Sequence, residues 1–449
     1  MTTPEYAQEL RTLLLSGESE IRRDLCAELP EATLAEVLTD QSPQSVWELL
    51  SLMQPWKRAA VFGYFTLDFQ VFLTENINKD ELADLLTEMS ADERVDLFKR
   101  LPEDAQESVF PLLAKAERED IRKLSSYDEN MAGSVMTSEY VTLTPDITVT
   151  QALEKLRRQW PGKETIYYAY VIDEGRRFLG FVSLRKLILA KPSAYVGDIM
   201  KAEAIYIRAT DPREMAAELI AKYDLIALPV VNGGDDALVG IITHDDALDV
   251  VTEEATEDML RMASTDSEEY ENPSILQSIR LRSPWLTLNL GTAMLSSFTV
   301  SLFQDTISHY VILAALMPII AGLGGNAGTQ TLAVTVRGIA LGKVPLGRGR
   351  EVILKEAGVG LLNGVIIGLL VGAIALFGFN KPWLGLIMLL AMVCNLVIAG
   401  FIGSAIPLAL KALKLDPALG SSVFITAATD ISGFFVFLSL ATLMMPLLQ

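Results

Sequence analysis

The spacing of apolar and polar residues changes twice along the chain. Residues 1 to about 128 consist of short stretches with the three- and four-residue spacing of amphipathic helices. The segments LPEATLAEVL (29–38) and LPEDAQESVF (101–110) both begin Leu-Pro-Glu, which places a proline and an acidic residue where the first turn of a helix favours them. We expect residues 1–128 to form an acidic, all-α domain built as a helical superhelix. An irregular helical bundle is the alternative.

Between about 130 and 250 the pattern becomes one of strands and helices, and it occurs twice. Met136 in the first copy corresponds to Met200 in the second, and Gly180 corresponds to Gly240. This duplication resembles a tandem pair of CBS domains, with repeats at 129–194 and 195–250. The resemblance implies an α+β pair that folds as one pseudo-symmetric unit and binds adenosine-type nucleotides or other regulators.

The nucleotide site of CBS pairs commonly uses a Ser or Thr and an Asp about three residues apart after the last strand. Thr243 and Asp246 match this pattern, whereas the first repeat has Ser183 and Lys186 at the corresponding places. The resemblance therefore implies one nucleotide site, with ATP as the candidate ligand and Tyr168 as a further contact. A CBS pair without nucleotide is the alternative.

Beyond Pro284 the chain becomes strongly apolar. About 20 apolar residues are needed for a helix to cross a bilayer. The sequence therefore predicts an α-helical membrane domain over 284–449 with five transmembrane helices in contact with lipid, preceded by a connecting helix over 251–283. The charge-free stretches are 283–304, 306–336, 357–380, 382–410 and 417–449, the last interrupted only by Asp430.

The charges of the chain are divided between these regions. The formal net charge is −20, yet residues 284–449 carry eight basic and five acidic residues, which leaves 29 basic and 52 acidic residues before them. Without a basic face, a nucleic-acid partner is excluded. Most basic residues near the spans flank one side, and Lys381 alone flanks the other. The positive-inside rule then predicts an inner-membrane protein with cytoplasmic N-terminal domains and an external C-terminus.

A predicted helix over 244–262 carries acidic residues at three- and four-residue steps, so that they share one face. Their repulsion destabilises the helix unless cations bridge it, and carboxylate oxygens are ligands that Mg²⁺ and Ca²⁺ prefer. Asp84, Glu88, Asp92 and Asp96 follow four-residue steps on what we expect to be one N-terminal helix. The pattern predicts a divalent-cation sensor formed across a domain boundary. A solvated acidic face is the alternative.

Asp430 interrupts the last span about 20 Å along its helix. A carboxylate at that depth costs about 2.5–3.5 kcal/mol, which marks it as a functional residue. The alternative is a protonated acid that bonds to a neighbouring helix. If two chains pair around this helix, their two carboxylates form an acidic ring that selects cations.

The segment PIIAGLGGNAGTQ in the second predicted span is unusually polar. Gly324 and Gly328 have the four-residue spacing that permits close helix packing. Asn326, Thr329 and Gln330 favour the lining of a water-filled pathway instead. The motif alone leaves pore lining and packing open, but its apolar flanks exclude a phosphate-binding loop.

The order of these segments is similar to the MgtE family of magnesium channels or transporters, and the resemblance covers essentially the whole chain. It rests on EEATED (253–258), PIIAGLGGNAGTQ and LDPALGSSVFITAATDISGF. It implies a homodimer with a central pore, closed when cytoplasmic Mg²⁺ fills the sensor sites. Pore metal ligands are then Asp430 and Asn326, pore-lining candidates are Gly325, Gly328, Gln330 and Thr426, and sensor ligands are Asp92, Asp96, Asp246, Asp249, Glu254, Glu257, Asp258 and Asp416.

The sequence thus predicts a Mg²⁺-selective channel or transporter of the cell membrane that imports Mg²⁺. The alternatives are an ion-coupled secondary transporter of divalent cations and a membrane-tethered metal or nucleotide sensor. No nucleophile and base pair, zinc-ligand spacing or Walker-type loop in the sequence supports an enzyme.

Overall fold

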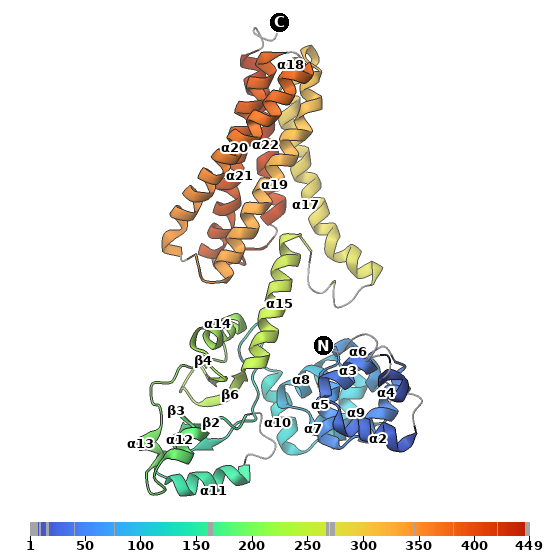
Figure 1. Cartoon of the computed structure of the whole chain (residues 1–449), viewed down its shortest axis with the longest axis vertical. Helices are drawn as coiled ribbons and strands as arrows, with labels where there is room; N and C mark the ends of the chain where they lie inside the picture. Colours follow the sequence, from blue (N-terminus) through green and yellow to red (C-terminus); the bar gives the residue numbers. More distant parts are fainter. Residues whose placement is uncertain are drawn as a thin grey trace. The chain divides into compact units, whose positions relative to one another are not determined.

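The computed structural model divides into two compact units, Met1–Thr252 and Glu253–Gln449 (Figure 1). It describes residues 8, 10–14, 18–39, 41–75, 77–159, 165–265, 269, 274–344, 346–379, 381–419 and 421–444.

Short helices open the first unit, and from α2 to α10 each begins twelve residues after the one before it. The seventh residue of each helix is apolar, and from α3 onward it is buried. The two Leu-Pro-Glu segments belong to this period, because they precede α3 and α9. The regular period supports a repeat array over an irregular bundle. The elements are α2 (Ser19–Glu28), α3 (Glu31–Leu38), α4 (Pro43–Leu50), α5 (Pro55–Gly63), α6 (Leu67–Thr74), α7 (Lys79–Glu88), α8 (Ala91–Arg100), α9 (Glu103–Val109), the 3₁₀ turn η1 (Phe110–Leu112) and α10 (Lys115–Leu124).

A long polar side chain at the fourth position of four of these helices caps the helix or turn before it. Carbonyl groups at a helix end lack partners within the helix, so such a cap removes a cost of burying that end. Gln70, Arg94, Gln106 and Arg118 donate to Phe65 O (2.9 Å), Met89 O (2.6 Å), Leu101 O (2.8 Å) and Leu113 O (3.1 Å).

The expected single helix through Asp84, Glu88, Asp92 and Asp96 is wrong. Helix α7 ends at Glu88 and α8 begins at Ala91, so the four carboxylates lie on two helices. The backbone of Met89 is extended, and its carbonyl accepts the Arg94 cap. The four-residue spacing therefore spans a repeat boundary.

Two three-stranded sheets follow, and they confirm the tandem CBS pair. In each sheet the first two strands pair in parallel and the last two pair antiparallel, in the orders β1-β2-β3 and β4-β5-β6. Gly180 and Gly240 occupy equivalent places, opposite Val171 and Val230. The strands are β1 (Thr142–Leu143), β2 (Tyr168–Ile172), β3 (Phe178–Ser183), β4 (Ile207–Arg208), β5 (Ala227–Val231) and β6 (Leu238–Thr243); the helices are α11 (Val149–Gln159), α12 (Leu184–Leu189), α13 (Val196–Ile199) and α14 (Arg213–Tyr223).

One apolar core joins the helical repeats to the second CBS repeat. Leu124 of α10 belongs to the same buried cluster as Leu228 and Ile242 of the second sheet. Lys123 of α10 also donates to the carbonyl of Val239, at 2.7 Å. The helical domain therefore rests on the second repeat through apolar packing as well as polar contacts.

Helix α15 (His244–Met262) continues from β6, in agreement with the helix expected over 244–262. The next long helix, α17, begins only at Ile275. The segment 251–283 therefore differs from the single connecting helix expected, although residues 266–268 and 270–273 lie outside those described.

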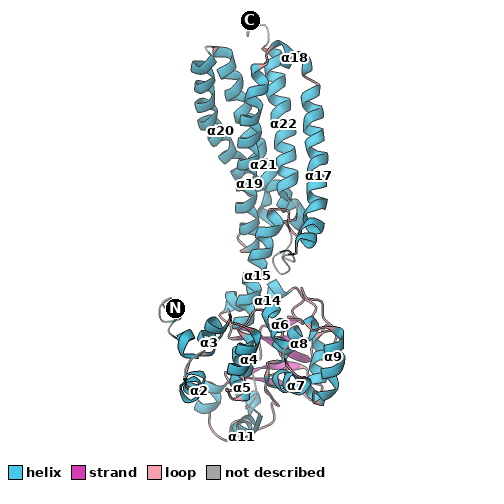
Figure 2. Cartoon of the chain, turned by 90° about the vertical axis from the view of Figure 1, so that its right-hand side faces the viewer, coloured by secondary structure: helices cyan, strands magenta, loops and turns pink. Residues whose placement is uncertain are grey.

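Long helices make up most of the second unit, and Figure 2 shows them running alongside one another. Within the described ranges, four have the length and apolar composition of a membrane span: α19, α20, α21 and α22. The expected first span corresponds to α17, which is long enough but contains several Ser and Thr residues and Asn289, so its hydropathy is lower. The bounds are α17 (Ile275–Ser301), α18 (Gln304–His309), α19 (Ile312–Ala340), η2 (Leu346–Arg348), α20 (Gly349–Phe379), α21 (Pro382–Ala412) and α22 (Ser421–Leu443).

Glycines set the close packing of α20 on α21. Gly360, Gly364, Gly368 and Gly372 recur every four residues and face α21. A methyl group added at Gly360 would lie 2.2 Å from the carbonyl oxygen of Leu396. The two backbones therefore touch, as small residues permit in membranes, where burial from water contributes nothing between helices.

Candidate functional site

Asp430 lies in α22 among apolar residues, and its side chain is only partly covered by the bundle. Its Oδ1 atom is buried, and within the described residues it has no hydrogen-bond partner. No Lys, Arg or His of the described chain forms an ion pair with it. The described part of the bundle therefore places this carboxyl group at membrane depth without a cationic partner.

The glycine-rich segment of α19 has two different faces. Gly324 and Gly328 are buried, and a methyl group at Gly328 would lie 2.4 Å from Ile425 Cγ2 of α22. These two glycines therefore serve helix packing, and Gly328, expected to line the pore, is enclosed within a single bundle. The side chains of Asn326, Thr329 and Gln330 are exposed on the other face.

Gly325 and Thr426 lie opposite each other where α19 meets α22. A methyl group at Gly325 would lie 3.8 Å from Thr426 Cγ2, which is ordinary contact. The structure therefore brings these two expected pore-lining positions together.

An acidic cluster in the first unit joins α8 to the start of α15. Burial raises the pKa of Asp92, and the charges of Glu93 and Asp96 raise it further. Burial likewise raises the pKa of Asp246, followed by the charges of Asp92 and Asp245. Asp92, Asp96 and Asp246 were expected in one site. Glu93 and Asp245 were missed, because only the fold shows which neighbours of Asp92 and Asp246 also face the cluster.

A second acidic cluster lies in the second unit, where the end of α15 meets the segment before α22. Arg261 forms ion pairs with both Glu257 and Asp416. Burial raises the pKa of Asp258 to about 6, with further contributions from the charges of Asp416 and Glu254. The sequence predicted these carboxylates but missed Arg261, although its position four residues after Glu257 is a signal for an ion pair.

Asp249 differs from the other expected sensor residues, because its side chain is exposed on α15. In the described part of the chain, no three His, Cys, Asp or Glu side chains are arranged closely enough to bind a metal ion. The clusters nevertheless consist mainly of carboxylate oxygens, the donors that Mg²⁺ favours, and Mg²⁺ commonly keeps several of its waters. The donor chemistry therefore fits a hydrated divalent cation.

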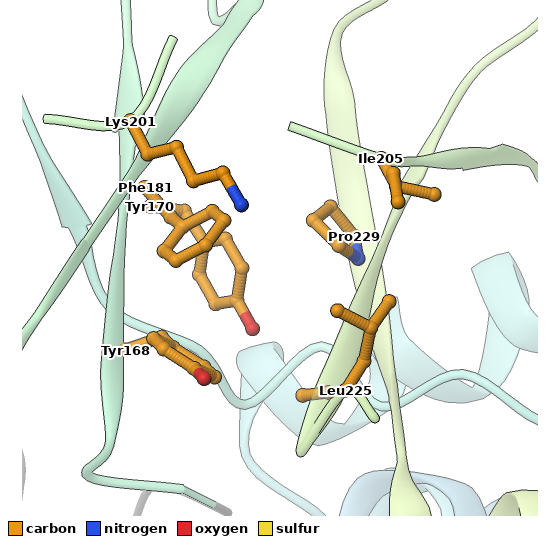
Figure 3. A pocket seen from close by; sticks show the side chains of 8 residues that line it. Tyr168, Tyr170, Phe181, Lys201, Ile205, Leu225 and Pro229 are labelled. Carbon is orange, nitrogen blue, oxygen red and sulfur yellow. The ribbon is translucent and has the colours of Figure 1, made fainter. Parts of the chain in front are cut away.

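A small pocket lies between the two CBS sheets, lined mainly by apolar and aromatic side chains (Figure 3). The rings of Tyr168, Tyr170 and Phe181 lie along one side, and the ammonium group of Lys201 lies 5.8 Å from the Phe181 ring centre. The buried Tyr170 hydroxyl has no hydrogen-bond partner among the described residues. The remaining lining residues are Ile205, Leu225, Ala227 and Pro229.

Two of the three expected nucleotide contacts do not line this pocket. Tyr168 does, but Thr243 donates its hydroxyl to Asp246 Oδ2 at 2.5 Å, and both residues lie elsewhere. The Thr and Asp spacing thus closes the turn at the start of α15.

Family comparisons cover most of the chain. Residues 317–440 match a family described as "Divalent cation transporter", and residues 29–130 match "MgtE intracellular N domain". Residues 132–193 and 196–253 match the CBS domain.

Individual relatives agree with these matches. Magnesium transporter MgtE of Thermus thermophilus is 34% identical over 98% of this chain and 93% of its own length. Magnesium transporter MgtE of Bacillus subtilis is 31% identical over 98% of each chain. A crystal structure of the cytosolic domain of the Mg²⁺ channel MgtE with ATP is 34% identical and covers 54% of this chain and 99% of that one, with a TM-score of 0.51.

Proposed function

Because this chain belongs to the MgtE family of magnesium transporters, we propose that it is a homodimeric Mg²⁺ channel whose pore is lined by Asp430 and closed by cytoplasmic Mg²⁺. The observation that carries the pore assignment is the carboxylate of Asp430, which lies in an apolar helix without a basic partner in the described chain. An acidic oxygen at that depth attracts a cation and disfavours anions.

Pairing of two chains is supported by the polar face of α19. Asn326, Thr329 and Gln330 are exposed on a helix of membrane-spanning composition, although polar groups exposed to lipid are costly. A twofold axis beside this face would bring the same residues of two chains together around water. Asn326 and Gln330 would then line the pathway with Asp430, and Gly325 and Thr426 would shape its wall.

Closure is supported by the two acidic clusters. Without Mg²⁺, carboxylates repel one another in the first cluster, and in the second cluster Arg261 offsets this repulsion only in part; bound Mg²⁺ would remove it. A ligand shifts a conformational equilibrium only by its preference for one state, so several weak sites acting together give a steep response. Asp92, Asp96 and Asp246 would contribute from the first unit, and Glu254, Glu257, Asp258 and Asp416 from the second, with Asp249 at the exposed edge.

ATP is the proposed ligand of the pocket between the CBS sheets. The aromatic rings of Tyr168, Tyr170 and Phe181 suit an adenine base, and Lys201 supplies a cation for phosphate. The ATP complex of the related cytosolic domain supports this choice. Tyr168 remains in the proposed site, whereas Thr243 and Asp246 bond to each other at the start of α15.

The distribution of basic residues supports the proposed orientation in the membrane. Arg337 lies near the C-terminal end of α19, Arg348 directly before α20 and Lys411 near the C-terminal end of α21, so all three belong to one side of successive antiparallel spans. Lys381, between α20 and α21, belongs to the other side. This multi-pass protein then has cytoplasmic N-terminal domains and an external C-terminus. With an inward electrical gradient, an open pore imports Mg²⁺.

Flux into proteoliposomes tests the pore assignment. We expect Asp430→Asn to remove most Mg²⁺ uptake, because the amide keeps the shape of the side chain but not its charge. Asp305→Asn is the matched control, since Asp305 is exposed on the short helix α18, outside the candidate spans. Undiminished uptake by a folded Asp430→Asn protein would overturn the assignment, and uptake that requires a proton or sodium gradient would favour a coupled transporter.

A further inference from the structure

Asn395 is a fully buried polar residue near the middle of α21. It lies about 20 Å along that helix, well within the apolar region. Its Nδ2 donates to the carbonyl oxygen of Ile320 on α19 at 2.8 Å, so the bond connects two membrane helices. Its Oδ1 is buried and accepts no hydrogen bond from the described residues.

Two glycines make room for this amide. A methyl group at Gly324 of α19 would lie 2.3 Å from Asn395 Nδ2, and one at Gly433 of α22 would lie 3.0 Å from both Nδ2 and Oδ1. The side chain of Asn395 is therefore enclosed by the backbones of two other helices. Three helices meet at a single amide group.

An apolar side chain would fill this space without burying an unpaired oxygen. A buried acceptor without a donor is costly, and leucine has the same number and branching of side-chain heavy atoms as asparagine without its polar groups. Packing alone therefore does not explain asparagine here. A polar group can instead fix one arrangement of helices, since its hydrogen bond forms in only one register.

The residues that Asn395 contacts lie next to the proposed ion ligands. Gly433 is three residues after Asp430 on the same face of α22. Gly324 is two residues before Asn326, which places Asn326 on the opposite, exposed side of α19. By contacting Gly324 and Gly433, Asn395 therefore fixes the rotation of α19 and α22 about their axes, and with it the depth at which Asn326 and Asp430 lie.

We propose that Asn395 is a positioning residue for ion conduction, which fixes Asn326 on α19 relative to Asp430 on α22 through its bond to Ile320 and its seat between Gly324 and Gly433. The inference rests on the proposed function, in which Asp430 and Asn326 face the ion. It adds a residue that does not itself contact Mg²⁺.

The concentration dependence of Mg²⁺ flux through the full chain in proteoliposomes tests this role. We expect Asn395→Leu to raise the half-saturating Mg²⁺ concentration by roughly fivefold, the factor that corresponds to one ordinary buried hydrogen bond. The matched control is Ser404→Ala on the same helix, because the hydrogen bonds of the buried Ser404 hydroxyl to described residues all lie within α21. A folded Asn395→Leu protein with the parent concentration dependence would overturn the inference.

A compensating pair separates positioning from packing. Gly324→Ala is expected to destabilise the protein, because its methyl group overlaps the amide, whereas Gly322→Ala on the same helix meets nothing within 4 Å. In the Asn395→Ala background, the methyl group of Gly324→Ala no longer meets the amide. The double variant should therefore regain the thermal stability that Gly324→Ala alone removes. If the half-saturating concentration stays raised in this double variant, positioning is supported; if it returns to the parent value, the amide only filled space.

Disulfide formation gives a readout that is independent of transport. A cysteine pair at Gly325→Cys and Thr426→Cys spans α19 and α22, where a methyl group at Gly325 would lie 3.8 Å from Thr426 Cγ2, in a chain whose own Cys26 and Cys394 are replaced by alanine. We expect Asn395→Leu to slow oxidation of this pair by roughly fivefold, in line with the loss of one hydrogen bond. An unchanged rate would overturn the inference even if the Asp430→Asn test upholds the pore.

Discussion

At the scale of single residues, the proposed function depends on carboxylates that have no basic partner in the described chain. Asp430 has no basic partner in the described chain, and burial together with neighbouring carboxylates raises the pKa of both Asp92 and Asp246. Such groups occur where a protein binds a cation or changes its protonation. The same physical feature thus supports a pore site in the membrane and a sensor site outside it.

The buried pair Asp92 and Asp246 predicts an unusual pH dependence in Mg²⁺-free solution. Their folded pKa values are raised, whereas aspartate in an unfolded chain has a pKa of about 3.9. Between those values the folded state binds more protons, so stability is present at low pH and is lost as pH rises toward neutrality. We expect the midpoint of thermal unfolding, measured in chelator, to fall as the pH is raised from about 5 to about 8.

Two comparisons complete this test. Asp246→Asn should flatten the pH dependence, because the amide does not ionise. Excess Mg²⁺ should raise the midpoint most at high pH, where the carboxylates are charged. A midpoint that rises with pH in chelator, in both the parent and the variant, would contradict the electrostatic coupling of Asp92 and Asp246.

Residue patterns in the sequence predicted some of these sites and missed others for a physical reason. Asp430 is visible because one charge interrupts a long apolar stretch. The roles of Arg261 and Asn395 cannot be recognised from the sequence. Arg261 pairs with Asp416 and Asn395 packs against Gly433, and both partners are distant in sequence. Thr243 and Asp246 match a nucleotide motif, yet their hydrogen bond closes a turn.

At the scale of elements, the twelve-residue repeat depends on side chains that cap the preceding helix. Arg94 is the most buried of these caps, and it also forms ion pairs with Asp120 and Glu139 at 3.7 Å. Removing the guanidinium group of Arg94 would leave the carboxylates of Asp120 and Glu139 without this partner, which is costly for a buried ion pair.

We therefore expect Arg94→Ala to lower the unfolding free energy by about 3 kcal/mol. Arg118→Ala should cost no more than about 1 kcal/mol, because it removes a cap that is more exposed. Denaturant unfolding of both variants checks the prediction. Equal losses for the two variants would show that burial of the cap has no effect.

The end of α15 is a second element whose position can be tested. Within the second unit, Arg261 pairs with Asp416, Met262 packs near Leu332 and Ile425, and the Ser264 and Ser422 hydroxyls lie 3.1 Å apart. The positive charge of Arg261 therefore helps to hold this helix end against the segment before α22.

Arg261→Gln should loosen this contact and make it depend on Mg²⁺. We expect a Ser264→Cys and Ser422→Cys pair to oxidise roughly tenfold more slowly with Arg261→Gln in chelator, with the rate recovering as Mg²⁺ is added. Lys414→Gln, which changes an exposed cation nearby in sequence, is the control. Oxidation that is insensitive to Arg261 would remove this role.

Helices and strands with a clear period were predicted well, because local pattern and tertiary fold agree in them. The helix over 244–262 and the duplicated sheets are examples. The break between α7 and α8 was missed, since the four-residue spacing of acidic residues continues across a repeat boundary. The polar composition of α17 explains why its span is weaker than the four that follow.

At the scale of the whole molecule, the formal charge of −20 is the difference between a strongly acidic first part and a slightly basic membrane part. The acidic surplus supplies the proposed sensor, and Asp430 supplies the proposed pore. If the sensor and the pore are coupled, Mg²⁺ bound at the sensor must change conduction through the pore. This coupling can be measured as a change in conduction when cytoplasmic Mg²⁺ is varied.

The most direct measurement is therefore current through excised membrane patches while Mg²⁺ on the cytoplasmic face is raised. The proposed channel function requires unitary currents carried by Mg²⁺ whose open probability falls as cytoplasmic Mg²⁺ increases, and loss of those currents in Asp430→Asn. Currents that persist unchanged at high cytoplasmic Mg²⁺ in the parent protein, or in Asp430→Asn, would contradict it.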